Sequence, residues 1–124
     1  MQVRTTVALQ SLSDTQGLDM ELFCNEFKRW KSADEYSSYW FGKDSAYIAP
    51  PVNGERYRLR HVHLVPLADK VQLAKWNQAW KRRTRKTSDR VLIYVGNHRG
   101  DFLLIFILPE PDAHAVATMK TTKP

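Results

Sequence analysis

Polar and apolar positions alternate strictly in two stretches of the chain. In residues 2–10, valine, threonine and leucine alternate with arginine, threonine, alanine and glutamine. In residues 56–65, arginines alternate with apolar residues and histidines, and Pro66 follows. Alternation is the period of a β-strand, whose successive side chains point to opposite faces. We therefore predict strands over residues 2–10 and 56–65, with a turn-forming segment over residues 11–17 after the first.

Two other stretches have the helical period. Residues 18–31 begin with acidic and end with basic side chains, which suits the helix dipole, and their apolar face holds Leu18, Leu22, Phe23, Phe27 and Trp30. Residues 69–83 have a less regular apolar stripe, made of Val71, Ala74, Trp76 and Trp80. We predict one helix over each stretch.

The remaining segments lack a clear period. Residues 32–54 crowd aromatic side chains among turn formers, so we interpret them as a loop packed by aromatics. Two apolar runs, residues 91–95 and 102–108, flank a glycine-containing loop, which predicts a β-hairpin. Neither run alternates, so both faces of these strands are expected to be covered. Residues 112–119 are interpreted as a short helix.

The order of these elements defines the expected fold class. Strands and helices do not alternate as in a parallel α/β protein, and the hairpin requires antiparallel pairing. We predict an α+β fold, with a mainly antiparallel sheet of about four strands flanked by helices. At 124 residues, the chain is expected to form a single domain, residues 1–124.

Charge narrows the choice of partners. The net charge is +6, and residues 55–90 hold 11 basic and 3 acidic side chains. Such a localised excess favours a polyanionic partner such as RNA. Cys24 is the only cysteine, and its amphipathic setting favours a small core residue over a nucleophile. Without a signal sequence or an apolar run long enough to span a membrane, the chain is predicted to be cytoplasmic.

The candidate chemistry lies in the middle strand. On a regular strand, Arg56, Arg58 and Arg60 share one face, while His61 and His63 share the other with Tyr57 and Leu59. A bulge or strand end near Arg60 would bring the cations and imidazoles into one cleft.

Several short motifs resemble the YafO-type toxins of bacterial type II toxin–antitoxin systems. The resemblance covers about residues 40–114 in order: Phe41-Gly42-Lys43-Asp44 with Tyr47, Arg58 with His61-Val62-His63-Leu64, both hairpin strands, then Pro109-Glu110-Pro111 and His114. It implies a RelE-like ribonuclease fold and an mRNA endonuclease that acts with the ribosome and is inhibited by an antitoxin. Many RelE-like ribonucleases place tyrosine or arginine near the C-terminus, whereas no such residue follows Pro111 here. The polar chemistry is therefore expected in residues 41–44 and the middle strand.

RNA cleavage through the ribose 2′-OH needs a base, an acid and cations for the developing phosphorane charge, but no metal or cofactor. We expect His61 and His63 to supply acid and base, Asp44 to orient an imidazole or act as base, and Lys43 and Arg58 to stabilise phosphate. The alternative is that both histidines are structural. His-x-His is also a metal-ligand spacing, with Asp44, His98 or His114 as third ligand. Because the sequence contains no Cys/His cluster with zinc spacing, we predict metal-independent chemistry.

Further cations are expected to contact RNA phosphates on messenger or ribosomal RNA, rather than to read bases. The predicted contacts are Arg56, Arg60, Lys81, Arg82, Arg83, Arg85, Lys86 and Arg99. The alternative for residues 81–86 is a solvated helix end, and for Arg99 an ordinary exposed loop tip.

The predicted function is that of a ribosome-dependent mRNA endoribonuclease toxin whose partners are mRNA, the ribosome and a cognate antitoxin. Two alternatives remain open. The first is a non-catalytic basic module that binds RNA or the ribosome, and the second is an interaction protein whose basic patch binds an acidic partner.

Overall fold

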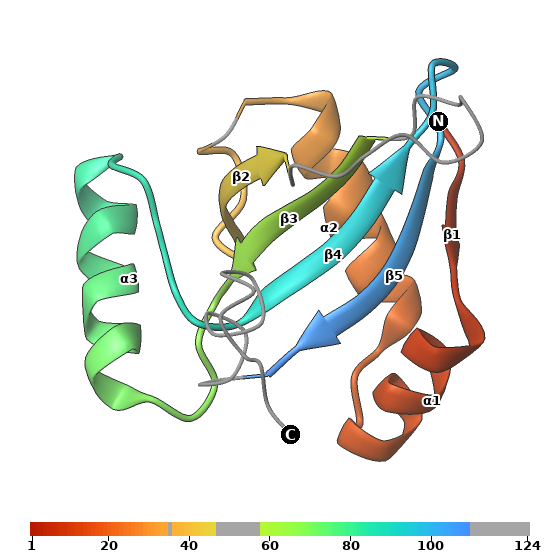
Figure 1. Cartoon of the computed structure of the whole chain (residues 1–124). Helices are drawn as coiled ribbons and strands as arrows, with labels where there is room; N and C mark the ends of the chain where they lie inside the picture. The colour runs from red at the N-terminus through yellow and green to blue at the C-terminus, as the bar shows by residue number, and fades with distance from the viewer. Residues whose placement is uncertain (35, 47–57, 110–124) are drawn as a thin grey trace, which may run out of the picture.

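A computed structural model describes residues 1–34, 36–46 and 58–109 (Figure 1). The elements along the chain are β1 (Val3–Thr5), α1 (Val7–Gln16), α2 (Met20–Ser32), β2 (Phe41–Ala46), β3 (Arg58–Leu64), α3 (Lys70–Arg82), β4 (Val91–Gly96) and β5 (Phe102–Leu108). The sheet has five strands in the order β1-β5-β4-β3-β2. All neighbours pair antiparallel except β1 and β5, which are parallel. The predicted α+β class and the mainly antiparallel sheet are confirmed.

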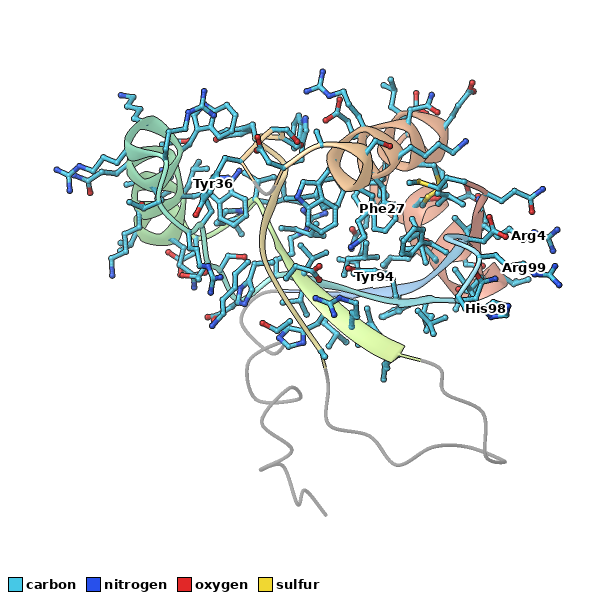
Figure 2. The ribbon with its side chains drawn as sticks, turned by 90° about the horizontal axis from the view of Figure 1, so that it is seen from above. Arg4, Phe27, Tyr36, Tyr94, His98 and Arg99 are labelled. Atoms are coloured by element: carbon cyan, nitrogen blue, oxygen red, sulfur yellow. The ribbon has the colours of Figure 1, made fainter. Side chains whose placement is uncertain are left out.

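The two faces of the sheet differ in what covers them. Helices α1 and α2 lie on one side, which we name the helix face (Figures 1 and 2). The opposite side carries no helix from the described ranges, and we name it the open face. Helix α3 lies beyond the β2 edge of the sheet (Figure 1). Most residues that face α1 and α2 are therefore buried, while most of those on the open face are half-buried.

The hydrophobic core lies between the helix face and α1 and α2. Amphipathic α2 contributes Phe27 and Trp30, and the Trp30 ring stacks on Phe41 with centroids 4.9 Å apart. The core also contains Leu9, Val62, Leu64, Leu92, Tyr94, Leu104 and Ile107. Phe23 packs against it as predicted, but Leu22 is 64% exposed and does not belong to the predicted apolar face.

The N-terminal strand is shorter than predicted, and the turn expected over residues 11–17 is wrong. Strand β1 ends at Thr5, and α1 occupies residues 7–16. The Thr6 hydroxyl accepts a hydrogen bond from Leu9 N–H at 3.1 Å and caps the helix. Gly17, at φ 68°, ends it in the left-handed conformation that glycine adopts without strain. These capping contacts override the weak alternation of residues 6–10.

Strand β2 lies in the segment interpreted as a loop, so that interpretation is wrong for residues 41–46. Its sequence is poor in β-branched residues, and it is held by pairing with β3. A Cβ at Gly42 would collide with the Lys86 carbonyl oxygen and the Trp76 ring. The glycine therefore allows the close approach in which Lys43 N–H donates to the Lys86 carbonyl at 2.9 Å.

The other predicted elements are found close to their expected limits. Strand β3, helix α3 and the β4–β5 hairpin are confirmed. Within α3, Trp76 is fully buried, whereas Val71 is 65% exposed, because the helix packs through its aromatic residues. The predicted helix over residues 112–119, and Arg56 and Tyr57, lie outside the described residues. No helix within the described ranges has the length and apolar character that crossing a membrane requires.

Candidate functional site

Strand β3 separates the candidate residues onto two faces of the sheet. Its register with β4 is regular from Arg58 to His63, so no bulge within β3 brings Arg60 to the side of the imidazoles. The irregularity lies in β2, between Phe41 and Asp44. It sets Asp44 opposite Val62 on the helix face and Ser45 opposite His61 on the open face. Arg60 and Asp44 therefore share one side, and the two histidines lie on the other.

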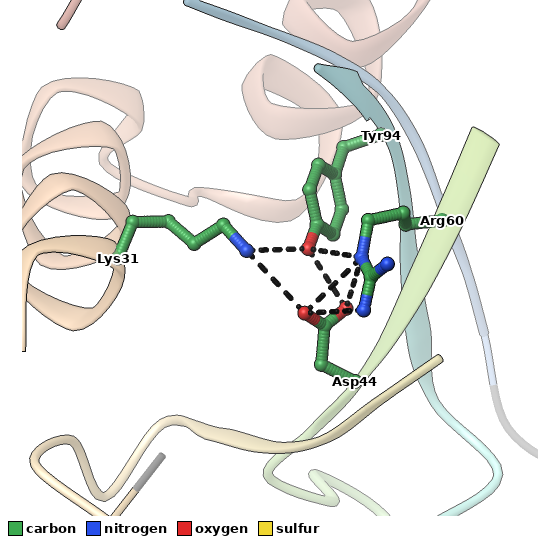
Figure 3. Close-up of polar contacts among 4 residues, drawn as sticks. All are labelled: Lys31, Asp44, Arg60 and Tyr94. Atoms are coloured by element: carbon green, nitrogen blue, oxygen red, sulfur yellow. Dashed lines mark hydrogen bonds and ion pairs between the residues drawn. The ribbon is translucent and has the colours of Figure 1, made fainter. Parts of the chain in front are cut away.

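On the helix face, three side chains from three other elements surround the Asp44 carboxylate (Figure 3). Arg60 Nη2 lies 3.1 Å and Lys31 Nζ 3.3 Å from Asp44 Oδ2. The Tyr94 hydroxyl donates to Asp44 Oδ1 at 2.7 Å and accepts from Lys31 Nζ at 3.0 Å and Arg60 Nε at 3.2 Å. We name these residues, Lys31, Asp44, Arg60 and Tyr94, the Asp44 cluster.

The Asp44 cluster is electrostatically satisfied. Burial, reinforced by the nearby Asp44 carboxylate, raises the pKa of Tyr94 well above its ordinary value, so the phenol stays protonated and donates. The carboxylate receives two cations and this hydroxyl, and its side chain is only 15% exposed. To act as a base, Asp44 would have to give up these contacts. The arrangement therefore suits a positioning role better than the expected proton transfer.

On the open face, His63 is oriented by the backbone of Ser88. Its Nδ1 lies 2.6 Å from the Ser88 carbonyl oxygen and 2.9 Å from Ser88 N. The Ser88 carbonyl accepts from Nδ1 when that nitrogen carries a proton, and Ser88 N–H donates to Nδ1 when it carries the lone pair. The backbone of Ser88 therefore orients the ring in either state, as in many catalytic and metal-binding histidines.

His61 lies beside His63, with ring centroids 5.9 Å apart. The pKa of His61 is lowered by burial and, to a smaller extent, by the charges of His63, Lys43 and Arg60, while Asp44 opposes the shift. A lowered pKa keeps the ring neutral near pH 7 and able to accept a proton. We name His61 and His63 the imidazole pair. Lys43, which the sequence predicts to stabilise phosphate, has a charge that acts on His61.

The remaining predicted RNA contacts are dispersed. Lys81, Arg82, Arg83 and Arg85 are exposed at and after the end of α3, and Arg99 is exposed in the β4–β5 turn. Lys86, in contrast, is 1% exposed. Its Nζ donates to the Ser38 carbonyl and lies 4.5 Å from the Trp80 ring centroid. This burial fits neither the predicted RNA contact of Lys86 nor the alternative of a solvated helix end. Arg58 begins β3, but its side chain, like all of Arg56, lies outside the described part.

Sequence reasoning missed three residues that shape the site. Lys31 was considered only for its favourable interaction with the dipole of the first predicted helix. Tyr94 was considered only as part of a covered strand, and Ser88 was placed in no predicted element. Tyr94 was detectable in principle, since a buried tyrosine hydroxyl needs a hydrogen-bond partner. Lys31 and Ser88 gave no local signal, because their partners lie 13 and 25 residues away.

Neither a metal centre nor a reactive thiol is evident in the described ranges. They contain no group of three or more histidine, cysteine, aspartate or glutamate side chains that could hold a metal ion. Cys24 packs against the core, and burial raises the pKa of its thiol, which agrees with the predicted role as a small core residue.

Comparison with known families decides the identity of the chain. The sequence profile of toxin YafO of type II toxin–antitoxin systems matches residues 28–123. The chain belongs to this family. The matched region of this YafO-family toxin contains the Asp44 cluster, the imidazole pair and the exposed cations after α3. As a type II toxin it has a cognate antitoxin as its partner. Searches of curated proteins and of solved structures gave no significant match.

Proposed function

We propose that this toxin is a metal-independent endoribonuclease that cleaves messenger RNA on the ribosome and thereby inhibits translation. The observation that carries the proposal is the imidazole pair: two rings 5.9 Å apart on the open face, one of them oriented by a backbone carbonyl. Membership of a toxin family supports it further.

The proposed reaction uses the two imidazoles in different protonation states. Neutral His61 takes the proton from the ribose 2′-OH, and the 2′-oxygen attacks the adjacent phosphorus. The bond from phosphorus to the 5′-oxygen breaks, and protonated His63 gives its proton to that oxygen. The products are a 2′,3′-cyclic phosphate and a 5′-hydroxyl end. The lowered pKa of His61 supports its assignment as the base.

Cations provide the second part of the mechanism. The charge of Lys43 acts on His61, and in this proposal Lys43 stabilises the charge of the phosphorane. Arg58 is proposed for the same role at the start of β3. Asp44 acts indirectly: it holds Arg60 on the helix face, and its charge opposes the lowering of the pKa of His61. In this proposal Asp44 is a positioning residue.

We propose that the ribosome positions the RNA, because the small sheet offers little surface for that purpose. Aligning the 2′-OH, the phosphorus and the leaving oxygen contributes several kcal/mol to catalysis. The ribosome already holds mRNA extended, and its RNA is polyanionic. We propose that the exposed cations Lys81, Arg82, Arg83 and Arg85 contact ribosomal RNA while the imidazole pair faces the message.

A single cleavage experiment tests the proposal. Purified protein is incubated with one mRNA, with and without ribosomes, and the new ends are mapped. We expect cleavage that depends on ribosomes and is lost in the His61→Ala/His63→Ala double variant. His98→Ala, which removes an exposed histidine from the β4–β5 turn, is the matched control and should cleave normally.

Three outcomes would contradict parts of the proposal. Equal cleavage of free RNA would remove the ribosome requirement. Cleavage by the double variant at the parental rate would show that the imidazoles have a structural role. Intact mRNA in every arm, with the protein bound to ribosomes, would instead assign a non-catalytic RNA-binding module.

A further inference from the structure

A pocket of about 400 Å³ lies where β1, β5 and the β4–β5 turn meet. Its walls include the side chains of Arg4 and Arg99, and its lining also contains Val95, Asp101, Phe102 and Leu103. Figure 2 shows Arg4 and Arg99 at the same end of the sheet, far from Tyr36 and α3. The pocket is thus separate from the Asp44 cluster and from the cations that follow α3.

Strand register places this pocket on the open face. Arg4 pairs with Leu103, Leu103 with Val95, and Val95 with Leu59. Cross-strand partners share a face, and Leu59 shares its face with His61 two residues further along β3. From strand spacing and rise, Arg4 and His61 are roughly 16 Å apart across the sheet. The pocket and the imidazole pair therefore lie on the same face of the sheet.

The pocket has the charge and shape to receive a nucleotide. Neither Arg4 nor Arg99 forms a salt bridge with a described residue, and both are exposed. Asp101 accepts a hydrogen bond from Gln2 N–H at 2.9 Å, so its carboxylate ties β1 to the turn. Two guanidinium groups accompany this single carboxylate, which leaves a net positive charge. Half-buried Val95 and Leu103 give the pocket an apolar floor.

We propose that this pocket binds a nucleotide of the single-stranded RNA substrate, several positions away from the cleaved phosphate. The two arginines contact phosphate oxygens, to which guanidinium groups bind through paired N–H donors. The apolar floor contacts the base or ribose, so binding is tolerant of sequence. The inference rests on the proposed function, because the imidazole pair defines where the cleaved phosphate lies.

Two double variants with the same charge change test the pocket. Arg4→Gln/Arg99→Gln removes two cations from the pocket, and Lys28→Gln/Arg29→Gln removes two exposed cations from α2 on the helix face. The probes are a dinucleotide and an oligonucleotide of about ten nucleotides. Both carry 2′-deoxy sugars, so neither can be cleaved. Fluorescence anisotropy over a range of salt concentrations measures their binding.

For the longer probe, we expect the Arg4/Arg99 variant to bind roughly tenfold more weakly, with a salt slope shallower by about 1.4, since two single-strand phosphate contacts are lost. The dinucleotide is too short to occupy the pocket and the imidazole pair together, so its affinity should differ less between the proteins than the affinity of the longer probe. An equal loss of affinity in the α2 variant would show a general charge effect. Unchanged affinity of the Arg4/Arg99 variant for the longer probe would show that the pocket does not contact the RNA. Either result overturns the inference.

The binding test is independent of catalysis. Because the probes lack the 2′-OH, length-dependent binding can be measured even if the protein cleaves nothing. Absence of cleavage by the parental protein would overturn the proposed function alone. Loss of the length dependence, with cleavage intact, would overturn the pocket alone.

Discussion

The two faces of β3 place adjacent residues in different environments. On the helix face, Arg60 is engaged with Asp44 and Tyr94 in a network that pairs one carboxylate with two cations. On the open face, His61 and His63 lie 5.9 Å apart, and Nδ1 of His63 contacts the backbone of Ser88. A closed network stabilises structure, whereas reactive groups must be able to change protonation state. The comparison predicts that changes on the helix face alter stability and changes on the open face alter rate.

The largest expected effect is on the open face. Replacing both His61 and His63 by alanine should lower the rate of mRNA cleavage by at least about 100-fold, the lower limit for removing general acid–base groups. The free energy of unfolding, measured by urea denaturation, should fall by about 1 kcal/mol for the loss of the His63 contact with the Ser88 backbone. A large loss of stability with little loss of rate would reverse the assignment of the two faces.

The next effect is on the helix face. Asp44→Ala leaves Lys31, Arg60 and the Tyr94 hydroxyl without their shared acceptor. Because these side chains are partly buried, we expect the free energy of unfolding to fall by about 2 kcal/mol. Urea denaturation measures this change, and Asp14→Ala on the exposed side of α1 is the control. An unchanged denaturation midpoint would mean that water accepts the hydrogen bonds in place of the carboxylate without loss of stability.

A smaller effect is expected from the single hydroxyl of the Asp44 cluster. Tyr94→Phe keeps the fully buried ring and removes the 2.7 Å hydrogen bond to Asp44. The free energy of unfolding should fall by about 1 kcal/mol, and the cleavage rate should be retained because the hydroxyl lies on the helix face. Denaturation and cleavage assays on the same preparation check both parts. A severe loss of cleavage by a stable Tyr94→Phe protein would show that the Asp44 cluster is part of the active site.

The smallest effect is the pH dependence contributed by His61. Its pKa in the folded protein lies below the ordinary value of 6.5, so the unfolded chain binds the proton more readily. This contribution to stability is present above pH 6.5 and is lost as the pH falls through the folded pKa. We expect His61→Gln to flatten the pH dependence of the unfolding free energy between about pH 5 and 7. Identical profiles for the parental protein and the His61→Gln variant would exclude a buried, neutral His61.

Local sequence determined those parts of the protein that depend on residues close together in the chain. The periodicity of residues 18–31 and 69–83 is sufficient to predict α2 and α3. The two apolar runs with their glycine-containing loop are sufficient to predict the β4–β5 hairpin. Alternation also predicted that Arg60 and His61 lie on opposite faces of β3. The ordered motifs over about residues 40–114 indicated the family that the profile match shows.

Tertiary structure decided what local patterns leave open. Strand β2 has little strand propensity and exists because β3 pairs with it and Gly42 lets it approach Lys86. The cation Lys86 is buried because the Ser38 carbonyl and the Trp76 and Trp80 rings surround its ammonium group. Lys31, Asp44, Arg60 and Tyr94 meet only when α2, β2, β3 and β4 pack together (Figure 3). Contacts between distant segments depend on the packing of whole elements, and local periodicity carries no information about that packing.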